Sequence, residues 1–70
     1  MEIAYGAEVR DKNGKMLGTV NKVIRDSWTG EISKFQVTTE LTEVDLFLSP
    51  ENVAEATPNE VKLKIAFDEI

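Results

Sequence analysis

The sequence contains no cysteine and no histidine among its 70 residues. Disulfide bonds are therefore excluded, as are zinc sites built from thiolate and imidazole ligands. A chain of this length forms one domain, residues 1–70, and buries only about 60% of the surface exposed in its unfolded form. Because disulfides and the usual metal ligands cannot add to so small a core, we expect self-association to stabilise it. The predicted partners are a second copy of the chain, a larger protein, or both.

Long apolar runs are also missing. A run such as Leu46–Leu48 is far shorter than the roughly 20 residues that span a bilayer, and the opening MEIAYGAE lacks the basic and then apolar pattern of a secretory signal. We expect no membrane insertion and a cytoplasmic location.

Basic residues are few: eight Lys and Arg stand against thirteen Asp and Glu, which gives a net charge of −5. Residues 1–37 carry +1 and residues 38–70 carry −6. Nucleic-acid binding normally requires a basic face, because neutralisation of phosphates supplies much of the affinity. Direct binding to nucleic acid is therefore disfavoured, although six basic residues lie in the first half: Arg10, Lys12, Lys15, Lys22, Arg25 and Lys34.

Three short segments carry the residues of tight turns: Asp11–Gly14, Asp26–Gly30 and Thr57–Glu60. The first two begin with Asp, whose carboxylate accepts backbone N–H groups, and end with Gly, which tolerates the left-handed conformation. The segments between the turns are rich in β-branched, aromatic and aliphatic residues. The predicted strands are Ala7–Arg10, Met16–Ile24, Ile32–Thr38, Asp45–Leu48 and Val61–Phe67.

Between the last two strands, Ser49–Val53 predicts one turn of helix or 3-10 helix near residues 50–53. Ser49 is a capping residue, Pro50 suits the first helical position, and Glu51 complements the positive end of a helix. Val53 is expected to return to the core.

Gly18 lies in the middle of the longest predicted strand, where glycine weakens pairing. Glycine at such a position often marks a bulge or a sharp bend. A bend there would let Leu17 and Val20 both point inward. The sequence therefore predicts an all-β fold, a small, strongly bent antiparallel β-barrel of about six strands whose first three strands are sequential neighbours. The residues assigned structural roles are Gly14, Gly18, Gly30 and Pro50.

The order and spacing of these residues resemble the PRC-barrel family. The resemblance covers about residues 6 to 66 and rests on Gly6-x-x-Val9-x-Asp11-x-x-Gly14-x-x-x-Gly18-x-Val20, then Asp26 and Gly30, Phe35 and Val37, and Pro50-x-x-Val53.

The resemblance implies a compact barrel of roughly six strands. Similar domains occur in the H subunit of photosynthetic reaction centres, in a maturation factor of the small ribosomal subunit, and alone in short archaeal and bacterial proteins. They share a binding surface and no catalytic constellation. Because this sequence has neither a transmembrane helix nor a second domain, it is most similar to a stand-alone member, possibly archaeal, and neither larger role is transferred.

Catalytic and metal-binding patterns are weak in this sequence. Ser27, Ser33 and Ser49 have no histidine or cysteine to activate them, so we expect no enzymatic activity and no cofactor. The segment from Asp11 fails as a calcium loop because its sixth residue is Met and its twelfth is Lys. The acidic residues Glu40, Glu43 and Asp45 form either a solvated loop, which is favoured, or a loose cation site.

Four apolar residues are candidate partner contacts: Trp28, Phe47, Phe67 and Ile70. Trp28 either covers one end of the barrel, which is favoured, or projects as an anchor, since Trp is enriched at interface hot spots. Phe47 is out of phase with Val44, Leu46 and Leu48, so one of these two sets should face outward.

Phe67 and Ile70 follow the last predicted strand, Val61–Phe67, which would present an unpaired edge unless the barrel closes. The sequence therefore predicts a homodimer whose interface includes the C-terminal segment. The function expected is a non-enzymatic protein–protein interaction module, and the alternative is an RNA- or ribosome-assembly-associated factor.

Overall fold

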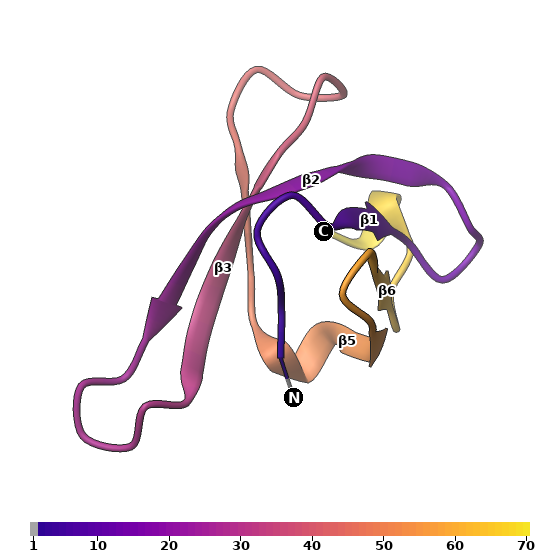
Figure 1. Ribbon diagram of the computed structural model, residues 1–70. Helices are drawn as coiled ribbons and strands as arrows, with labels where there is room; N and C mark the ends of the chain where they lie inside the picture. Colours follow the sequence, from indigo (N-terminus) through magenta and orange to yellow (C-terminus); the bar gives the residue numbers. More distant parts are fainter. Residues whose placement is uncertain (1) are drawn as a thin grey trace.

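The computed structural model describes residues 2–70, which form one six-stranded sheet and two single turns of 3-10 helix (Figure 1). No α-helix occurs within these residues, which confirms the predicted all-β class. The strands are β1 (Glu8–Arg10), β2 (Met16–Arg25), β3 (Ile32–Thr38), β4 (Leu46–Leu48), β5 (Val53–Ala56) and β6 (Glu60–Leu63), and the 3-10 turns are η1 (Pro50–Asn52) and η2 (Phe67–Glu69).

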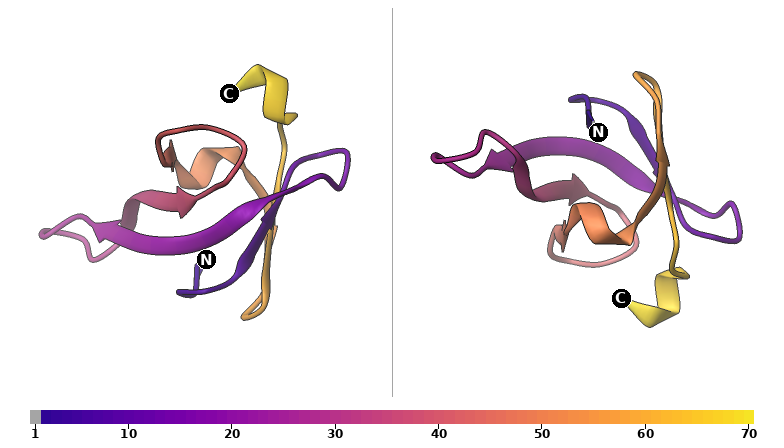
Figure 2. Two further views of the ribbon diagram at one scale, coloured as in Figure 1. Left: turned by 90° about the horizontal axis from the view of Figure 1, so that it is seen from above. Right: turned by 90° about the horizontal axis from the view of Figure 1, so that it is seen from below.

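The strand order is β4-β3-β2-β1-β6-β5, and the sheet curls into a half-barrel (Figure 2). The first four strands form an antiparallel meander, as predicted for the first three. The prediction of a wholly antiparallel barrel is wrong in one respect, because β1 and β6 are parallel, with Val9 opposite Val61. This follows from η1, which joins β4 to β5 without reversing the direction of the chain, so that β6 runs the same way as β1.

Two bulges bend β2. Between the pairs Val9–Gly18 and Arg10–Met16 one residue of β2 has no partner, and Asn21 is skipped in the pairing with β3. Each extra residue shifts the alternation of side chains by one position. Leu17 and Val20 are therefore both buried, at 2% and 3% exposure, despite their odd spacing, as the sequence analysis expected.

Gly18 itself is required for close approach of another strand rather than for an unusual φ. A Cβ atom built on Gly18 would overlap the carbonyl oxygen of Thr38 and come within 2.9 Å of its carbonyl carbon. Backbone atoms cannot move aside as a flexible side chain can. The glycine therefore lets the end of β3 cross closely over β2.

The turns have the predicted chemistry. The Asp11 Oδ1 atom accepts hydrogen bonds from the Asn13 and Lys15 N–H groups at 2.9 and 2.8 Å. Gly14 and Gly30 have φ values of 84° and 74°, in the left-handed region. Pro50 opens η1, and the Asn52 side chain accepts the Ser49 N–H at 3.1 Å, so the predicted turn is confirmed.

The core lies on the concave face of the sheet. Its largest fully buried side chain is Phe35, and Val53 returns to the core as expected. β5 was not among the predicted strands. The predicted strand Val61–Phe67 ends at Leu63, because the next residues bond to the first turn instead: the Lys12 N–H donates to the Ile65 carbonyl at 3.0 Å.

Candidate interaction surface

The hairpin formed by β2 and β3 projects from the rest of the sheet (Figure 1). β1 pairs with β2 only as far as Thr19, and β4 pairs with β3 only from Phe35 to Val37, so the distal parts of both strands extend beyond their neighbours. Trp28 lies in the turn of this hairpin and is 94% exposed. The interpretation of Trp28 as a cover over the barrel is therefore wrong, and its side chain is free for contact.

The hairpin turn is held by several hydrogen bonds. The Asp26 Oδ1 atom accepts the N–H groups of Trp28 and Thr29 at 2.7 and 3.2 Å. The Arg25 guanidinium donates to the Gly30 carbonyl at 2.9 Å and also lies 3.2 Å from the Glu2 carboxylate. Trp28 is thus presented on a defined turn, and the entropy lost when a partner fixes its backbone is correspondingly reduced.

Phe47 faces outward from β4. It is 57% exposed, whereas Leu46 and Leu48 on either side are buried. Val44 was grouped with the leucines in the sequence analysis, but it is 72% exposed because it precedes β4 in an irregular loop. Gln36 lies opposite Phe47 on β3, and its amide donates to the Asp45 carboxylate at 2.6 Å.

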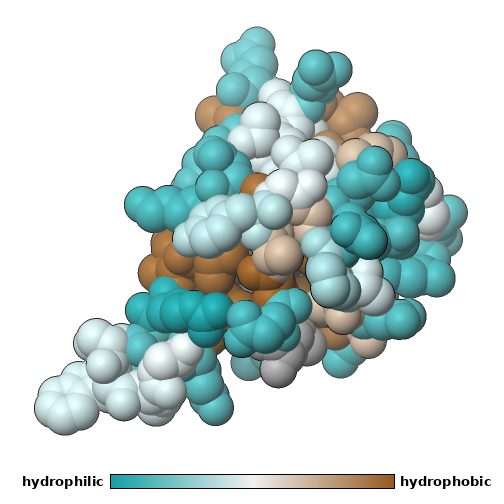
Figure 3. Space-filling view, viewed as in Figure 1, coloured by the Kyte–Doolittle hydropathy of each residue, from teal (hydrophilic) through white to brown (hydrophobic). Residues whose placement is uncertain are grey.

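Apolar surface is visible in the space-filling view. On the face seen in Figure 3 it gathers beside the projecting hairpin and is bordered by hydrophilic residues. Other large apolar side chains are exposed that no sequence pattern marked, among them Tyr5 at 68% and Leu41 at 44%. Leu41 stands alone between Glu40 and Thr42, and Tyr5 lies between the small residues Ala4 and Gly6, so hydrophobic periodicity could not have found them.

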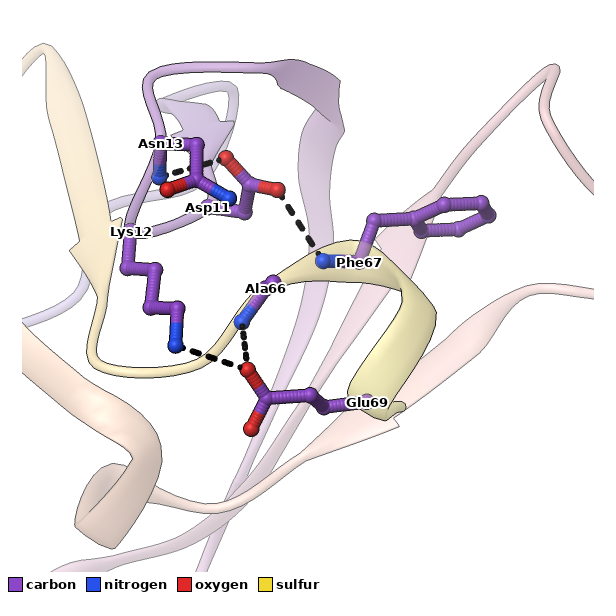
Figure 4. A network of polar contacts seen from close by, with 6 residues as sticks. All are labelled: Asp11, Lys12, Asn13, Ala66, Phe67 and Glu69. Carbon is purple, nitrogen blue, oxygen red and sulfur yellow. Dashed lines mark hydrogen bonds and ion pairs between the residues drawn. The ribbon is translucent and has the colours of Figure 1, made fainter.

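The C-terminal segment is attached to the first turn through Asp11 (Figure 4). The Asp11 Oδ2 atom accepts the Phe67 N–H at 3.0 Å, and the residue is only 2% exposed. This bond, together with those from Lys15 and Asn13, holds the pKa of the Asp11 carboxyl below its usual value, although burial opposes the shift. Asp11 thereby joins two segments that are 56 residues apart in the sequence.

A second connection runs beside it. The Lys12 ammonium lies 2.9 Å from the Glu69 carboxylate, which also accepts the Ala66 N–H at 3.2 Å (Figure 4). The hydrogen bond with Lys12 lowers the pKa of Glu69, and the same contact raises the pKa of Lys12. The described end of the chain is thus tied to the first turn.

These contacts bear on the predicted dimer interface at the C-terminal segment. Phe67 packs in part against the core, and the Lys15 ammonium lies 4.9 Å from the centre of its ring, whereas Ile70 is 46% exposed. The argument from an unpaired last strand is wrong, because β6 lies between β1 and β5. The outer strands of the sheet are β4 and β5. Partner contact by Phe67 and Ile70 stays a prediction.

The candidate cation site is not assembled. Within residues 2–70, no three acidic side chains lie close enough together to hold a metal ion. Glu40, Glu43 and Asp45 share a loop, but Asp45 is bonded to Gln36. Of the three serines considered, Ser49 contacts the Asn52 side chain at 3.3 Å, within the capping of η1.

The comparisons with known proteins add no relative. No protein-family model matches the chain, and no curated protein matches it significantly in sequence. None of the helices in the part of the chain that the structure describes has the length and apolar character needed to cross a membrane. Membership of the PRC-barrel family therefore stays a prediction based on the motif, and the small curled sheet is the feature that the structure establishes.

Proposed function

We propose that this protein is a non-enzymatic protein–protein interaction module of the PRC-barrel type. It acts in the cytoplasm as a homodimer or by docking on a larger protein. The observation that carries the proposal is Trp28, 94% exposed on a hydrogen-bonded turn at the end of a projecting hairpin. When a partner covers a large apolar side chain that is otherwise exposed to water, the free energy of the complex falls.

The free energy released by burying the Trp28 side chain is large enough to support specific binding. A Trp side chain buries about 150–250 Å² in an interface. At about 25 cal/mol per Å², this contributes roughly 4–6 kcal/mol before the costs of association are subtracted. Phe47 adds a second exposed aromatic side chain on β4. One or two such anchors are typical of the few residues that dominate an interface.

The alternative is an RNA- or ribosome-assembly-associated factor. The observation in its favour is that Lys22 and Lys34 lie on the same outward face of the sheet as Phe47, through the pairs Lys22–Gln36–Phe47 and Ile24–Lys34. Lysines beside an exposed aromatic ring suit single-stranded nucleic acid. The net charge of −5 opposes this alternative.

Affinity capture from cells of the source organism tests the proposal. The baits are the wild-type chain, Trp28→Ala and the matched control Tyr5→Ala, which removes an aromatic side chain that is also exposed. We expect a set of proteins that wild type and Tyr5→Ala retain and Trp28→Ala loses, or self-association with the same dependence. Identical capture by all three baits would refute the role of Trp28. Salt-sensitive capture of RNA would favour the alternative.

A further inference from the structure

A second candidate surface lies at the opposite end of β3 from the Trp28 hairpin. It is a groove of about 350 Å³ between the start of β2 and the loop that follows β3. β3 has seven residues, so the two ends are about 20 Å apart. Its lining includes Met16, Leu17, Gly18, Glu40 and Leu41.

The groove exists because β2 and β3 diverge. Their pairing begins at Thr19 and Thr38, so the preceding residues Met16 and Gly18 pair with β1 on one side and have no described strand partner on the other. At Gly18 the Thr38 carbonyl occupies the side on which a Cβ would lie, so the open part of this edge lies beside Met16 and Leu17. The groove is therefore bordered by an unpaired strand edge, the kind of edge to which an extended peptide adds.

The walls of the groove combine apolar and acidic groups. Met16 and Leu41 are 37% and 44% exposed. Glu40 lines the groove, and Glu43 belongs to the same loop. Residues 35–61 contain six Asp and Glu and no Lys or Arg.

No basic group of the described chain neutralises this loop. The carboxylates found in ion pairs within residues 2–70 are those of Glu2, Glu8 and Glu69. Lys15, the basic residue nearest to the groove in sequence, places its ammonium over the Phe67 ring. The groove is therefore complementary to an apolar side chain with positive charge beside it.

We propose that this groove binds an extended, basic segment of a partner protein. One apolar side chain of the segment lies between Met16 and Leu41, and flanking Lys or Arg residues lie near Glu40 and Glu43. The peptide backbone runs along the free edge of β2. RNA does not fit, because its phosphates would be repelled by the acidic loop. This site is separate from the Trp28 hairpin and does not depend on it.

Selection from a library of random linear ten-residue peptides on the immobilised full chain tests the proposal. We expect selected peptides that share an apolar residue flanked by Lys or Arg. In amide NMR spectra of the full chain, they should shift signals of residues 16–19 and 38–44. Glu40→Lys and Leu41→Ser should each weaken binding about tenfold or more, as hot-spot substitutions do.

Two control variants distinguish binding in the groove from non-specific apolar binding and from binding through Trp28. Val44→Ser changes a more exposed side chain of the same loop that does not line the groove, and Trp28→Ala removes the hairpin anchor. Both variants should bind the selected peptides as wild type does. A failure to select any peptide, a selection of acidic or uncharged peptides, or signal shifts centred on residues 26–31 would overturn the proposal. Loss of binding in Trp28→Ala alone would also overturn it.

Discussion

Gly18→Ala is the substitution that tests most sharply how the sheet is bent. The added methyl group would overlap the Thr38 carbonyl group, whose atoms belong to the backbone, so β2 and the end of β3 must move apart. Overpacking of this kind costs about 1–3 kcal/mol. The loss of flexibility in the unfolded chain returns about 0.4–1 kcal/mol when Gly becomes Ala. We therefore expect a net loss of about 1–2 kcal/mol, against a total stability of roughly 4–10 kcal/mol for a domain of this size.

Thermal unfolding followed by circular dichroism measures this loss. A destabilisation of about 1 kcal/mol lowers Tm by roughly 4–8 °C in a domain of this length. Gly18→Val, with a larger branched side chain, should lower Tm further. Gly14→Ala separates the clash from backbone strain, because no atom lies within 4 Å of a Cβ built there and any loss of stability comes from the φ of 84° alone. An unchanged midpoint in Gly18→Ala would refute the close approach of β3.

Three further predictions concern the core, the hairpin and the C-terminal attachment. Phe35→Ala empties the centre of the core, where Phe35 is 0% exposed, and should cost about 3–5 kcal/mol in denaturant unfolding; a loss below 1 kcal/mol would contradict the placement. Trp28→Ala should change the free energy of unfolding by no more than about 0.5 kcal/mol, because the side chain is exposed, and a large loss would place it in the core after all. The pKa of Asp11 is lower in the folded state than in the unfolded chain, so its contribution to stability is complete at neutral pH. That contribution should begin to fall as the pH drops below the usual aspartate value of about 3.9, and it should be gone once the pH is below the lowered pKa of the folded state. Asp11→Asn should therefore be less stable at pH 7 and show a weaker dependence on pH below 5, whereas parallel stability curves would contradict the bond to Phe67.

Features set by neighbouring residues were predictable from the sequence. The carboxylates of Asp11 and Asp26 and the left-handed Gly14 and Gly30 define their turns locally, and those turns separate the strands. β3 was predicted with its observed bounds, Ile32–Thr38, because Ile, Phe and Val dominate it. The turn at Pro50 followed from capping chemistry.

Features set by distant contacts were not predictable. β5, with the sequence VAEA, carries little strand propensity of its own and is defined by pairing with β6. The parallel pair of β1 and β6 and the bond from Phe67 to Asp11 join the two ends of the chain, and no local pattern reports them. The role of Gly18 was recognised as a bend, but the close approach of Thr38 depends on where β3 crosses.

The candidate interaction surface was likewise predictable only in part. The sequence singled out Trp28 and Phe47 as residues that were either buried or exposed, and only the fold decided between these alternatives. The groove beside Met16 and Leu41 was not foreseen, because it depends on where β2 and β3 separate.

Photo-crosslinking from the hairpin tests the central claim most directly. A photoreactive phenylalanine analogue is placed at Trp28 in the full chain, and in a parallel chain at Glu55 on β5, and both are irradiated in cells of the source organism. We expect a discrete covalent adduct with one protein, or with a second copy of the chain, from position 28 and none from position 55. Absence of a protein adduct at position 28, or the same adducts from both positions, would contradict it.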